Sequence, residues 1–584
     1  MFKLIKRLQM IDWLYFVCAV VFIVLQVGLD IKLVDYTRKL MELIRESSPI
    51  NQIWVQGGYM LICSLASLVG AMLCGFFFAM ISARLSRNLR REVYLKVQSL
   101  SMADVQKFSV SSLITRTTND ITQVQMFIAM GMQMLIKAPL TAIWAITKIA
   151  NKSWEWSTLT AGSVIVILVG VTIIMSLVLP KFKKVQAYID DINNVTEEQL
   201  SGIRVVHAFN AEAYQEAKFE EKNQTLTNTQ IFNQRTMGFM NPLMYLVMNF
   251  MSLGIYWIGA YLISGADMAV KGILSDDMVT FNGYASQVVS AFLSLVMIFI
   301  MWPRASVSAV RINQVLSTKN SILNGSFAGE TEMKGVIEFR NVSFKYPDSE
   351  ELMLKNISFQ TKPGDTLAFI GSTGSGKTTV VNLLMRFYDC TEGEILIDGV
   401  NIKDYDLETL YNKIGYVPQR AILFSGTVSD NIAFGDSGKA AISDEQIKQA
   451  VAIAQSTDFV EKMADGYQGN VAQGGTNLSG GQKQRLSIAR AVARDPEIYI
   501  FDDSFSALDY ATDYKLRTEL KRHTKNATNV IVAQRIGTIM NADTIVVLEK
   551  GECVGIGSHR ELLKKCKTYQ EIAYSQLSKE ELNG

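Results

Sequence analysis

Long apolar runs in the first half and short alternating segments in the second divide the chain into two parts. Apolar runs continue to about residue 305, and strand-like and helix-like segments alternate after about residue 335. A helix that crosses a membrane needs about 20 mostly apolar residues. Six runs meet or approach that length: 13–33, 55–82, 122–148, 157–180, 237–264 and 280–302. A large soluble helical core is disfavoured, because 163–179 and 292–302 carry no charge.

The pattern therefore predicts an α-helical membrane domain with six transmembrane helices at 1–305. A linker is expected at 306–335, followed by a soluble domain at 336–584. The stretches after the second and fourth spans are too long to be turns and keep helical periodicity. Since a helix rises about 1.5 Å per residue, we expect long cytoplasmic extensions that turn back near 107–115 and 209–214.

Basic residues cluster after the second and fourth spans, and few lie in the loops after the third and fifth. The first outer loop is an exception, with Arg38, Lys39 and Arg45. Cytoplasmic loops are enriched in Lys and Arg. The asymmetry predicts a multi-pass protein of the cytoplasmic membrane with both termini in the cytoplasm.

Composition excludes several classes of protein. Of 584 residues, 49% are apolar and 19% are charged, and the net charge is +2. A disordered chain is excluded by the apolar content, and a nucleic-acid binder that works by bulk charge is excluded by the net charge. Six cysteines without metal-ligand spacing do not form a disulfide scaffold. The polar end at 576–584 predicts a frayed terminus.

A glycine-rich motif follows a predicted buried strand at 367–371. The segment GSTGSGKTT has the Walker A spacing, in which backbone amides face phosphate oxygens, the lysine reaches the outer phosphates and the next hydroxyl ligates magnesium. The strand before it and the mainly apolar helix after it are the expected context for ATP binding. The candidate residues are Gly371, Ser372, Thr373, Gly374, Ser375, Gly376, Lys377, Thr378 and Thr379.

Two further motifs lie downstream of the Walker A segment. The apolar strand at 498–501 runs into Asp502, a carboxylate suited to the magnesium shell, followed by Asp503. The segment LSGGQKQR at 478–485 places Ser479, Gly480, Gly481 and Gln482 at a helix start. Such a start is either an ordinary capped helix or a second phosphate-facing surface. A second surface in one chain is best explained by a nucleotide held on another subunit.

These motifs, in this order and spacing, resemble those of the ATP-binding cassette family, together with Gln419 in YVPQ and FDDSFSALD ending at Asp509. The resemblance implies a half-transporter of the exporter class: six spans followed by an α/β P-loop nucleotide-binding domain. It implies that two chains pair around two ATP molecules with Mg²⁺ and that Tyr346 stacks on adenine. It also implies that Gln419 joins the magnesium site and links it to the cytoplasmic turns.

Two catalytic positions depart from the family's pattern. The general base is normally Glu, and this chain has Asp503; the switch residue is normally His, and this chain has Gln534. None of its three histidines, His207, His523 and His559, is near the switch position in sequence. The pattern resembles the degenerate subunit of heterodimeric bacterial exporters. It predicts a site that binds ATP and hydrolyses it poorly, unless Asp503 is still an adequate base, and a distinct partner with Glu and His.

Polar and methionine residues in the spans are candidates for substrate contact. Methionine surfaces adapt to varied ligands, and polar residues in a span tend to face a bundle interior. The methionines alternatively pack helices or face lipid, and Lys137 alternatively pairs with a helix carbonyl or extends to the membrane surface. The candidates are Asn241, Tyr245, Asn249, Met244, Met248, Lys137 and Gln287.

The sequence as a whole predicts ATP-driven export of a hydrophobic or amphipathic substrate, such as a drug, a lipid or a peptide. The alternative from another class is a regulatory or sensor protein that uses the same cassette without transport. The six spans and their polar faces favour transport.

Overall fold

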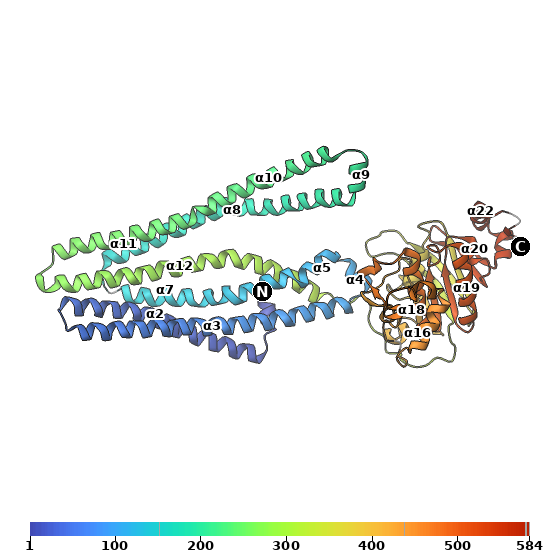
Figure 1. Ribbon diagram of the computed structural model, residues 1–584, viewed down its shortest axis with the longest axis horizontal. Helices are drawn as coiled ribbons and strands as arrows, with labels where there is room; N and C mark the ends of the chain where they lie inside the picture. Colours follow the sequence, from blue (N-terminus) through green and yellow to red (C-terminus); the bar gives the residue numbers. More distant parts are fainter. Residues whose placement is uncertain (151, 437, 579–580, 583–584) are drawn as a thin grey trace. The chain divides into compact units, whose positions relative to one another are not determined.

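A computed structural model of the chain describes residues 1–150, 152–436, 438–578 and 581–582 (Figure 1). The chain forms two compact units. The membrane unit comprises Met1–Val97 and Val110–Ser317. The cassette unit comprises Gln98–Ser109 and the chain from Thr318 onward.

The membrane unit is built from long helices joined by short turns. Its elements are α1 (Phe2–Ile5), α2 (Met10–Arg45), α3 (Ile50–Ser99), α5 (Val110–Thr117), α6 (Asn119–Met126), a π-helical turn (Phe127–Gly131), α7 (Met132–Ile149), α8 (Trp154–Ser201), α9 (Ile203–Ala208), α10 (Glu212–Gly238), α11 (Met240–Ser264) and α12 (Met268–Ser317). Residues 306–317, which the sequence pattern assigns to the linker, continue α12.

The six predicted spans are confirmed. Among the described residues, the helical segments long and apolar enough to cross a membrane are Met10–Arg45, Ile50–Ser99, Val110–Ile149, Trp154–Ser201, Glu212–Ser264 and Val270–Ser317. The predicted turn near 209–214 is confirmed, because the chain turns between α9, which ends at Ala208, and α10, which begins at Glu212 (Figure 1). The hairpin α8–α9–α10 extends away from the bundle of α2, α3, α7 and α12 (Figure 1).

Ion pairs join three spans at one end of the membrane unit. Arg38 pairs with Asp277 at 3.0 Å and Arg45 pairs with Asp276 at 3.1 Å, so α2 is joined to α12. Lys148 of α7 pairs with Asp35 of α2 at 2.8 Å. These pairs give a structural reason for Arg38 and Arg45, two of the basic residues that weaken the charge asymmetry in the sequence.

The cassette unit contains a ten-stranded sheet with the order β5-β4-β1-β2-β12-β11-β3-β10-β9-β6. Strands β11, β3, β10, β9 and β6 are parallel neighbours, and β5, β4, β1 and β2 pair antiparallel. Their bounds are β1 (Ile337–Phe344), β2 (Leu354–Gln360), β3 (Thr366–Gly371), β4 (Glu392–Ile397), β5 (Val400–Asn401), β6 (Ile414–Val417), β9 (Ile498–Asp502), β10 (Thr528–Val532), β11 (Thr544–Glu549) and β12 (Glu552–Gly557). A separate pair is formed by β7 (Gly426–Thr427) and β8 (Asn470–Val471).

The described part of the cassette unit also contains helices. They are α4 (Met102–Gln106), α13 (Lys377–Leu384), α14 (Leu407–Asn412), α15 (Val428–Ile432), α16 (Asp444–Ile453), α17 (Thr457–Val460), α18 (Gly480–Arg494), α19 (Tyr510–His523), α20 (Ile536–Ile539), α21 (His559–Lys565) and α22 (Lys567–Gln576). Parallel strands end at the same edge of a sheet. This edge therefore receives the segments that follow β3, β6, β9 and β10, which carry the Walker A motif, Gln419, Asp503 and Gln534.

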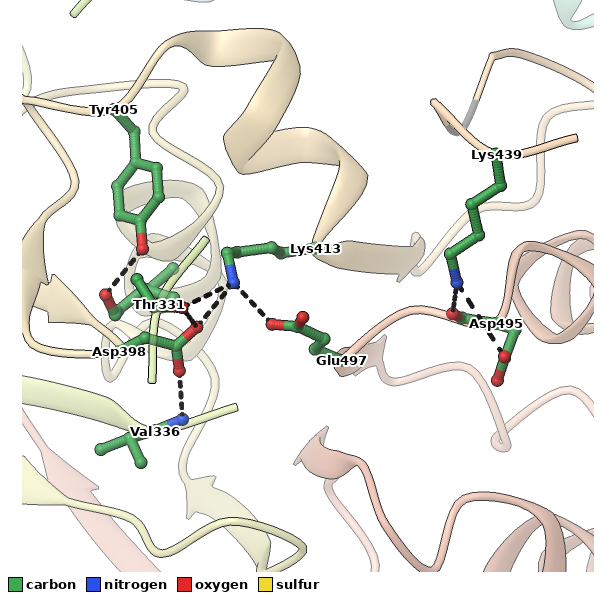
Figure 2. A network of polar contacts seen from close by, with 9 residues as sticks. Thr331, Val336, Asp398, Tyr405, Lys413, Lys439, Asp495 and Glu497 are labelled. Atoms are coloured by element: carbon green, nitrogen blue, oxygen red, sulfur yellow. Dashed lines mark hydrogen bonds and ion pairs between the residues drawn. The ribbon is translucent and has the colours of Figure 1, made fainter. Parts of the chain in front are cut away.

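A buried ion network holds the start of the cassette to its sheet (Figure 2). Lys413 Nζ donates to Asp398 Oδ2 at 2.8 Å, to Glu497 Oε2 at 2.7 Å and to Thr331 Oγ1 at 3.1 Å. The other Asp398 oxygen accepts from the Val336 backbone N–H at 2.9 Å. One lysine thus joins four segments that are distant in the sequence.

Replacing Lys413 by Met should destabilise the cassette strongly, because it leaves Asp398 and Glu497 without their cation. Removing one partner of a buried ion pair costs about 3–5 kcal/mol. Thermal unfolding of the purified chain in detergent measures the loss. The control is Lys439→Met, since Lys439 and Asp495 (Figure 2) are 57% and 76% exposed and such pairs contribute about 0–1 kcal/mol. Equal effects of the two substitutions would contradict the importance of the buried network.

The prediction of a frayed C-terminal end is wrong for the part that the structure describes. Leu582 is buried in the core formed with α21 and α22. The backbone oxygen of Leu582 is 3.1 Å from Nε2 of the buried His559. The mainly polar segment 576–584 contains two leucines, and both Leu577 and Leu582 pack against this core.

Candidate active site

The segment between β3 and α13 forms a loop around the Lys377 side chain. Lys377 Nζ donates to the backbone oxygens of Gly371 and Ser372, both at 2.8 Å. Gly376, which precedes α13, has φ +104°, and a Cβ at this position would lie 2.5 Å from Leu354 Cδ2. Burial lowers the pKa of the Lys377 ammonium. The loop thus places a lysine at a helix N-terminus, which is a favourable environment for phosphate.

Two adjacent carboxylates lie at the end of β9. Asp502 is the last residue of this buried strand. Burial, followed by the adjacent Asp503 carboxylate, raises the pKa of Asp502 to about 6. Asp503 has φ +46°, and its N–H donates to the Val532 oxygen at 2.9 Å. This turn directs Asp503 toward the end of β10, close to Gln534.

The three residues Asp503, Gln534 and Gln419 form one hydrogen-bonded cluster. Asp503 Oδ2 accepts from Gln534 Nε2 at 2.8 Å and from Gln419 Nε2 at 3.3 Å. Burial raises the pKa of Asp503, although both amide hydrogen bonds act to lower it. The structure thus brings together the two positions that depart from the family's pattern. One carboxylate oxygen, the group that a general base would use, is occupied by two amides.

An aromatic contact connects Tyr346 to one of the predicted turns. The Tyr346 hydroxyl lies 3.1 Å from Thr379 Oγ1, and its ring meets the Tyr388 ring edge-on with centroids 5.2 Å apart. The Tyr388 hydroxyl donates to Gln106 Oε1 of α4 at 2.8 Å. The first turn thus packs with the cassette. Sequence reasoning missed Tyr388 and Gln106, because neither belongs to a motif.

The segment with Ser479 begins α18 and has the geometry of a capping box. Ser479 Oγ accepts from the Gln482 N–H at 3.3 Å, and the Ser479 N–H donates to Gln482 Oε1 at 2.8 Å. A capped helix start is therefore present. The first amides of a helix lack partners within it, so Gly480 and Gly481 keep donors for an anion. Ser479 and Gly480 are exposed.

A cavity of about 640 Å³ lies among the spans α2, α7 and α12. Lys137 and Gln287, both predicted from the sequence, line it, and so does Asp30. Lys137 Nζ lies 3.6 Å from Asp30 Oδ2, and Gln287 Nε2 donates to the Asp30 backbone oxygen at 3.1 Å. Asp30 also accepts from Ser67 of α3. Asp30, which the sequence analysis did not single out, thus joins four spans.

The polar stripe of α11 has a different position. Asn241, Tyr245 and Asn249 are exposed, Tyr245 at 68%. Met244 and Met248 are half-buried. These residues are separate from those that line the cavity around Lys137.

Comparison with known proteins identifies the family. The ABC transporter transmembrane region matches residues 13–301, and the ABC transporter domain matches residues 354–506. An uncharacterized ABC transporter ATP-binding protein of Mycobacterium bovis is 38% identical over 89% of this chain and 87% of its own length. This chain belongs to the ABC transporter family. Membership implies that the cassette binds ATP and that the chain is a multi-pass, ATP-driven transporter subunit.

Three other similarities extend over most of this ABC transporter. An uncharacterized ABC transporter ATP-binding protein of Bacillus subtilis, YfiB, is 35% identical over 91% of each chain. An ATP-dependent lipid A-core flippase of Pseudomonas aeruginosa is 31% identical over 86% of this chain and 82% of its own. The structure of a bacterial Atm1-family ABC exporter with ATP bound superposes with a TM-score of 0.78 over 97% of this chain and 98% of that one, at 24% identity. The predicted fold class is confirmed as an ABC exporter fold.

Proposed function

We propose that this ABC transporter subunit is one half of a heterodimeric exporter and that its own Walker-side site holds ATP while hydrolysing it poorly. The observation that carries this proposal is the cluster in which Gln534 and Gln419 occupy one oxygen of Asp503. Asp is one carbon–carbon bond, about 1.5 Å, shorter than Glu. A general base must come within about 2.6–3.2 Å of the proton that it removes. Gln534 donates a hydrogen bond and carries no charge.

The same residues fit a magnesium ion. Magnesium prefers oxygen ligands and is bound by carboxylates together with substrate phosphates. Thr378 is exposed, and Asp502 ends β9. Gln419 donates from its amide nitrogen to Asp503, which leaves its amide oxygen for a metal. Burial and the neighbouring carboxylate disfavour charge on Asp502, and a divalent cation would offset both effects. In this proposal magnesium would neutralise the phosphate charge.

The exposure of two segments, the start of α18 and the turn after α9, supports pairing with a second subunit. We call the segment LSGGQKQR at 478–485 the signature; its residues Ser479 and Gly480 are exposed and lie at the start of α18. The hairpin turn at α9 exposes Phe209 at 77% and Tyr214 at 70%. In this proposal the signature completes the ATP site of a distinct partner chain that has Glu and His at the two catalytic positions. Both termini then lie in the cytoplasm, at the membrane face where ATP is available.

The membrane cavity supports a hydrophobic or amphipathic substrate. Its volume of about 640 Å³ is in the range of ligand pockets, about 300–1,000 Å³. Met130 and Met134 supply apolar surface, while Lys137 and Asp30 supply charge. A lipid is one candidate, since a relative is named as a lipid A-core flippase, and drugs and peptides are others. A sensor without transport is less well supported, because a charged cavity among spans is costly and usually marks a substrate path.

The transport proposal is tested with inside-out vesicles that contain this chain and its partner. We expect ATP-dependent accumulation of an amphipathic fluorescent dye, and no accumulation with either chain alone. ATP binding without accumulation of any amphipathic probe would favour the sensor alternative. Accumulation by this chain alone would contradict the requirement for a distinct partner.

Replacing Lys137 by Ala should change which substrates are transported. The substitution leaves Asp30 as the charge in the cavity, so anionic dyes should be disfavoured relative to cationic dyes by about tenfold, the effect of roughly 1.4 kcal/mol. The ratio of initial uptake rates for matched anionic and cationic dyes measures this. Lys148→Ala is the control, because Lys148 lies on the same helix and pairs with Asp35. An unchanged ratio would argue against substrate contact at Lys137.

A further inference from the structure

The C-terminal helix α22 makes direct contact with the segment that carries Gln534. Gln576, the last residue of α22, donates from Nε2 to the Gln534 backbone oxygen at 2.8 Å. Its Oε1 accepts from the Ile536 N–H, also at 2.8 Å. One side chain therefore fixes the peptide groups on both sides of Arg535. We call residues 534–538 the switch segment.

Helix α22 is a firm support for this contact. Tyr569 and Ala573 are fully buried in the core that α22 shares with β11 and α20. The Tyr569 hydroxyl lies 2.6 Å from Nδ1 of the buried His559. Thr568 donates to Glu549, at the end of β11, at 2.8 Å. The position of Gln576 is thus set by the sheet rather than by an exposed terminus.

A second side chain holds the other end of the switch segment. Arg517 of α19 donates to the backbone oxygens of Gly537 at 3.1 Å and Thr538 at 3.3 Å. Arg517 itself is paired with Asp513 at 2.9 Å. The segment therefore lies between two supports, and Gln576 is the one adjacent to Gln534.

We propose that Gln576 is a positioning residue for Gln534 and that it contributes to ATP retention at this site. By holding the Gln534 peptide, it directs the Gln534 amide toward Asp503, next to the phosphate-binding loop. The inference rests on the proposed function, in which this site retains ATP; one Nε2 hydrogen of Gln534 is donated to Asp503, and the inference assigns the other to the terminal phosphate of bound ATP. Without Gln576 the Gln534 peptide is free to rotate, and the amide loses its fixed direction.

The test measures release of a fluorescent, non-hydrolysable ATP analogue, MANT-AMPPNP, from the purified full-length chain. Gln576→Ala should accelerate release about 5- to 10-fold, the factor expected for one lost neutral hydrogen bond. Gln576→Glu keeps an acceptor for the Ile536 N–H but places a carboxylate against the Gln534 backbone oxygen. Release of the analogue from this variant should therefore be at least as fast as from Gln576→Ala. The control is Gln570→Ala, because Gln570 of the same helix donates to Leu563 at 2.7 Å and does not contact the switch segment.

A double-mutant cycle separates positioning from a general loss of stability. In a Gln534→Ala background, Gln576→Ala should accelerate release by less than about twofold, because the group that it positions is absent. The proposal would be overturned if the Gln576→Ala variant released the analogue at the wild-type rate. It would also be overturned if Gln576→Ala accelerated release equally with and without Gln534→Ala. Equal acceleration by Gln570→Ala would overturn it as well. Because the analogue is not hydrolysed, these outcomes are independent of the poor hydrolysis in the proposed function, which is scored separately by ADP formation.

Discussion

Replacing Asp503 by Glu and Gln534 by His in the same chain is expected to raise ATP hydrolysis at its own site by about 10²- to 10⁴-fold, the usual contribution of a positioned general base. Glu adds the missing carbon–carbon bond, about 1.5 Å. The second substitution removes the amide that occupies Asp503 Oδ2 at 2.8 Å. The release rate of inorganic phosphate from the purified chain measures the gain.

The single substitutions separate the effect of side-chain length at position 503 from the effect of the Gln534 hydrogen bond to its carboxylate. Asp503→Glu alone should recover only part of the activity, because Gln534 would still donate to the new carboxylate. Gln534→His alone should recover less, since the carboxylate stays short. Affinity for ATP should change by less than about threefold in all three variants, because Lys377 and the loop around it are untouched. A double variant as inactive as the original chain would contradict the proposed cause of poor hydrolysis.

Replacing Gly480 by Asp is expected to abolish most ATP hydrolysis by the assembled transporter, although Gly480 lies outside this chain's own site. In the proposed heterodimer, the start of α18 faces the terminal phosphate of ATP on the partner. A carboxylate at this point opposes the phosphate charge and competes for the free amides at the helix start. Loss of one such stabilising contact typically costs about 10²- to 10³-fold in rate. The steady-state ATPase rate of the purified complex is the measurement.

The structure also supplies a control for Gly480. A Cβ at Gly480 meets no atom within 4 Å, and an acidic residue in the first turn favours a helix, so folding should be preserved. Gly480→Ala adds the same Cβ without charge and should cost at most about tenfold. Full activity of Gly480→Asp in the complex would show that the signature of this chain does not complete a working site.

Features that depend on local pattern could be predicted from the sequence. The spans follow from runs of apolar residues, because lipid requires them. The Walker A loop follows from glycine spacing, because its backbone conformation is available to few other residues at positions such as Gly376. The meeting of Asp503 and Gln534 depends instead on β9 and β10 being parallel neighbours, which the structure shows.

Contacts between distant residues that belong to no motif could not be predicted. Asp30 lies near the end of an apolar run, and its partners Ser67, Lys137 and Gln287 come from three other helices. Gln576 begins the polar tail for which the sequence predicts a frayed end, yet it contacts the backbone of Gln534. The polar residues Asn241, Tyr245 and Asn249 of α11 are visible in the sequence pattern, but their exposure depends on how α11 packs.

The identity of the nucleotide retained by this chain tests the central claim most directly. The purified full-length chain would be incubated with magnesium and ATP, separated from free nucleotide, and denatured, and the released nucleotide would be analysed by chromatography. A site that binds ATP and hydrolyses it poorly should yield about one nucleotide per chain, recovered as ATP. Recovery mainly as ADP, with phosphate release at ordinary transporter rates, would contradict the claim.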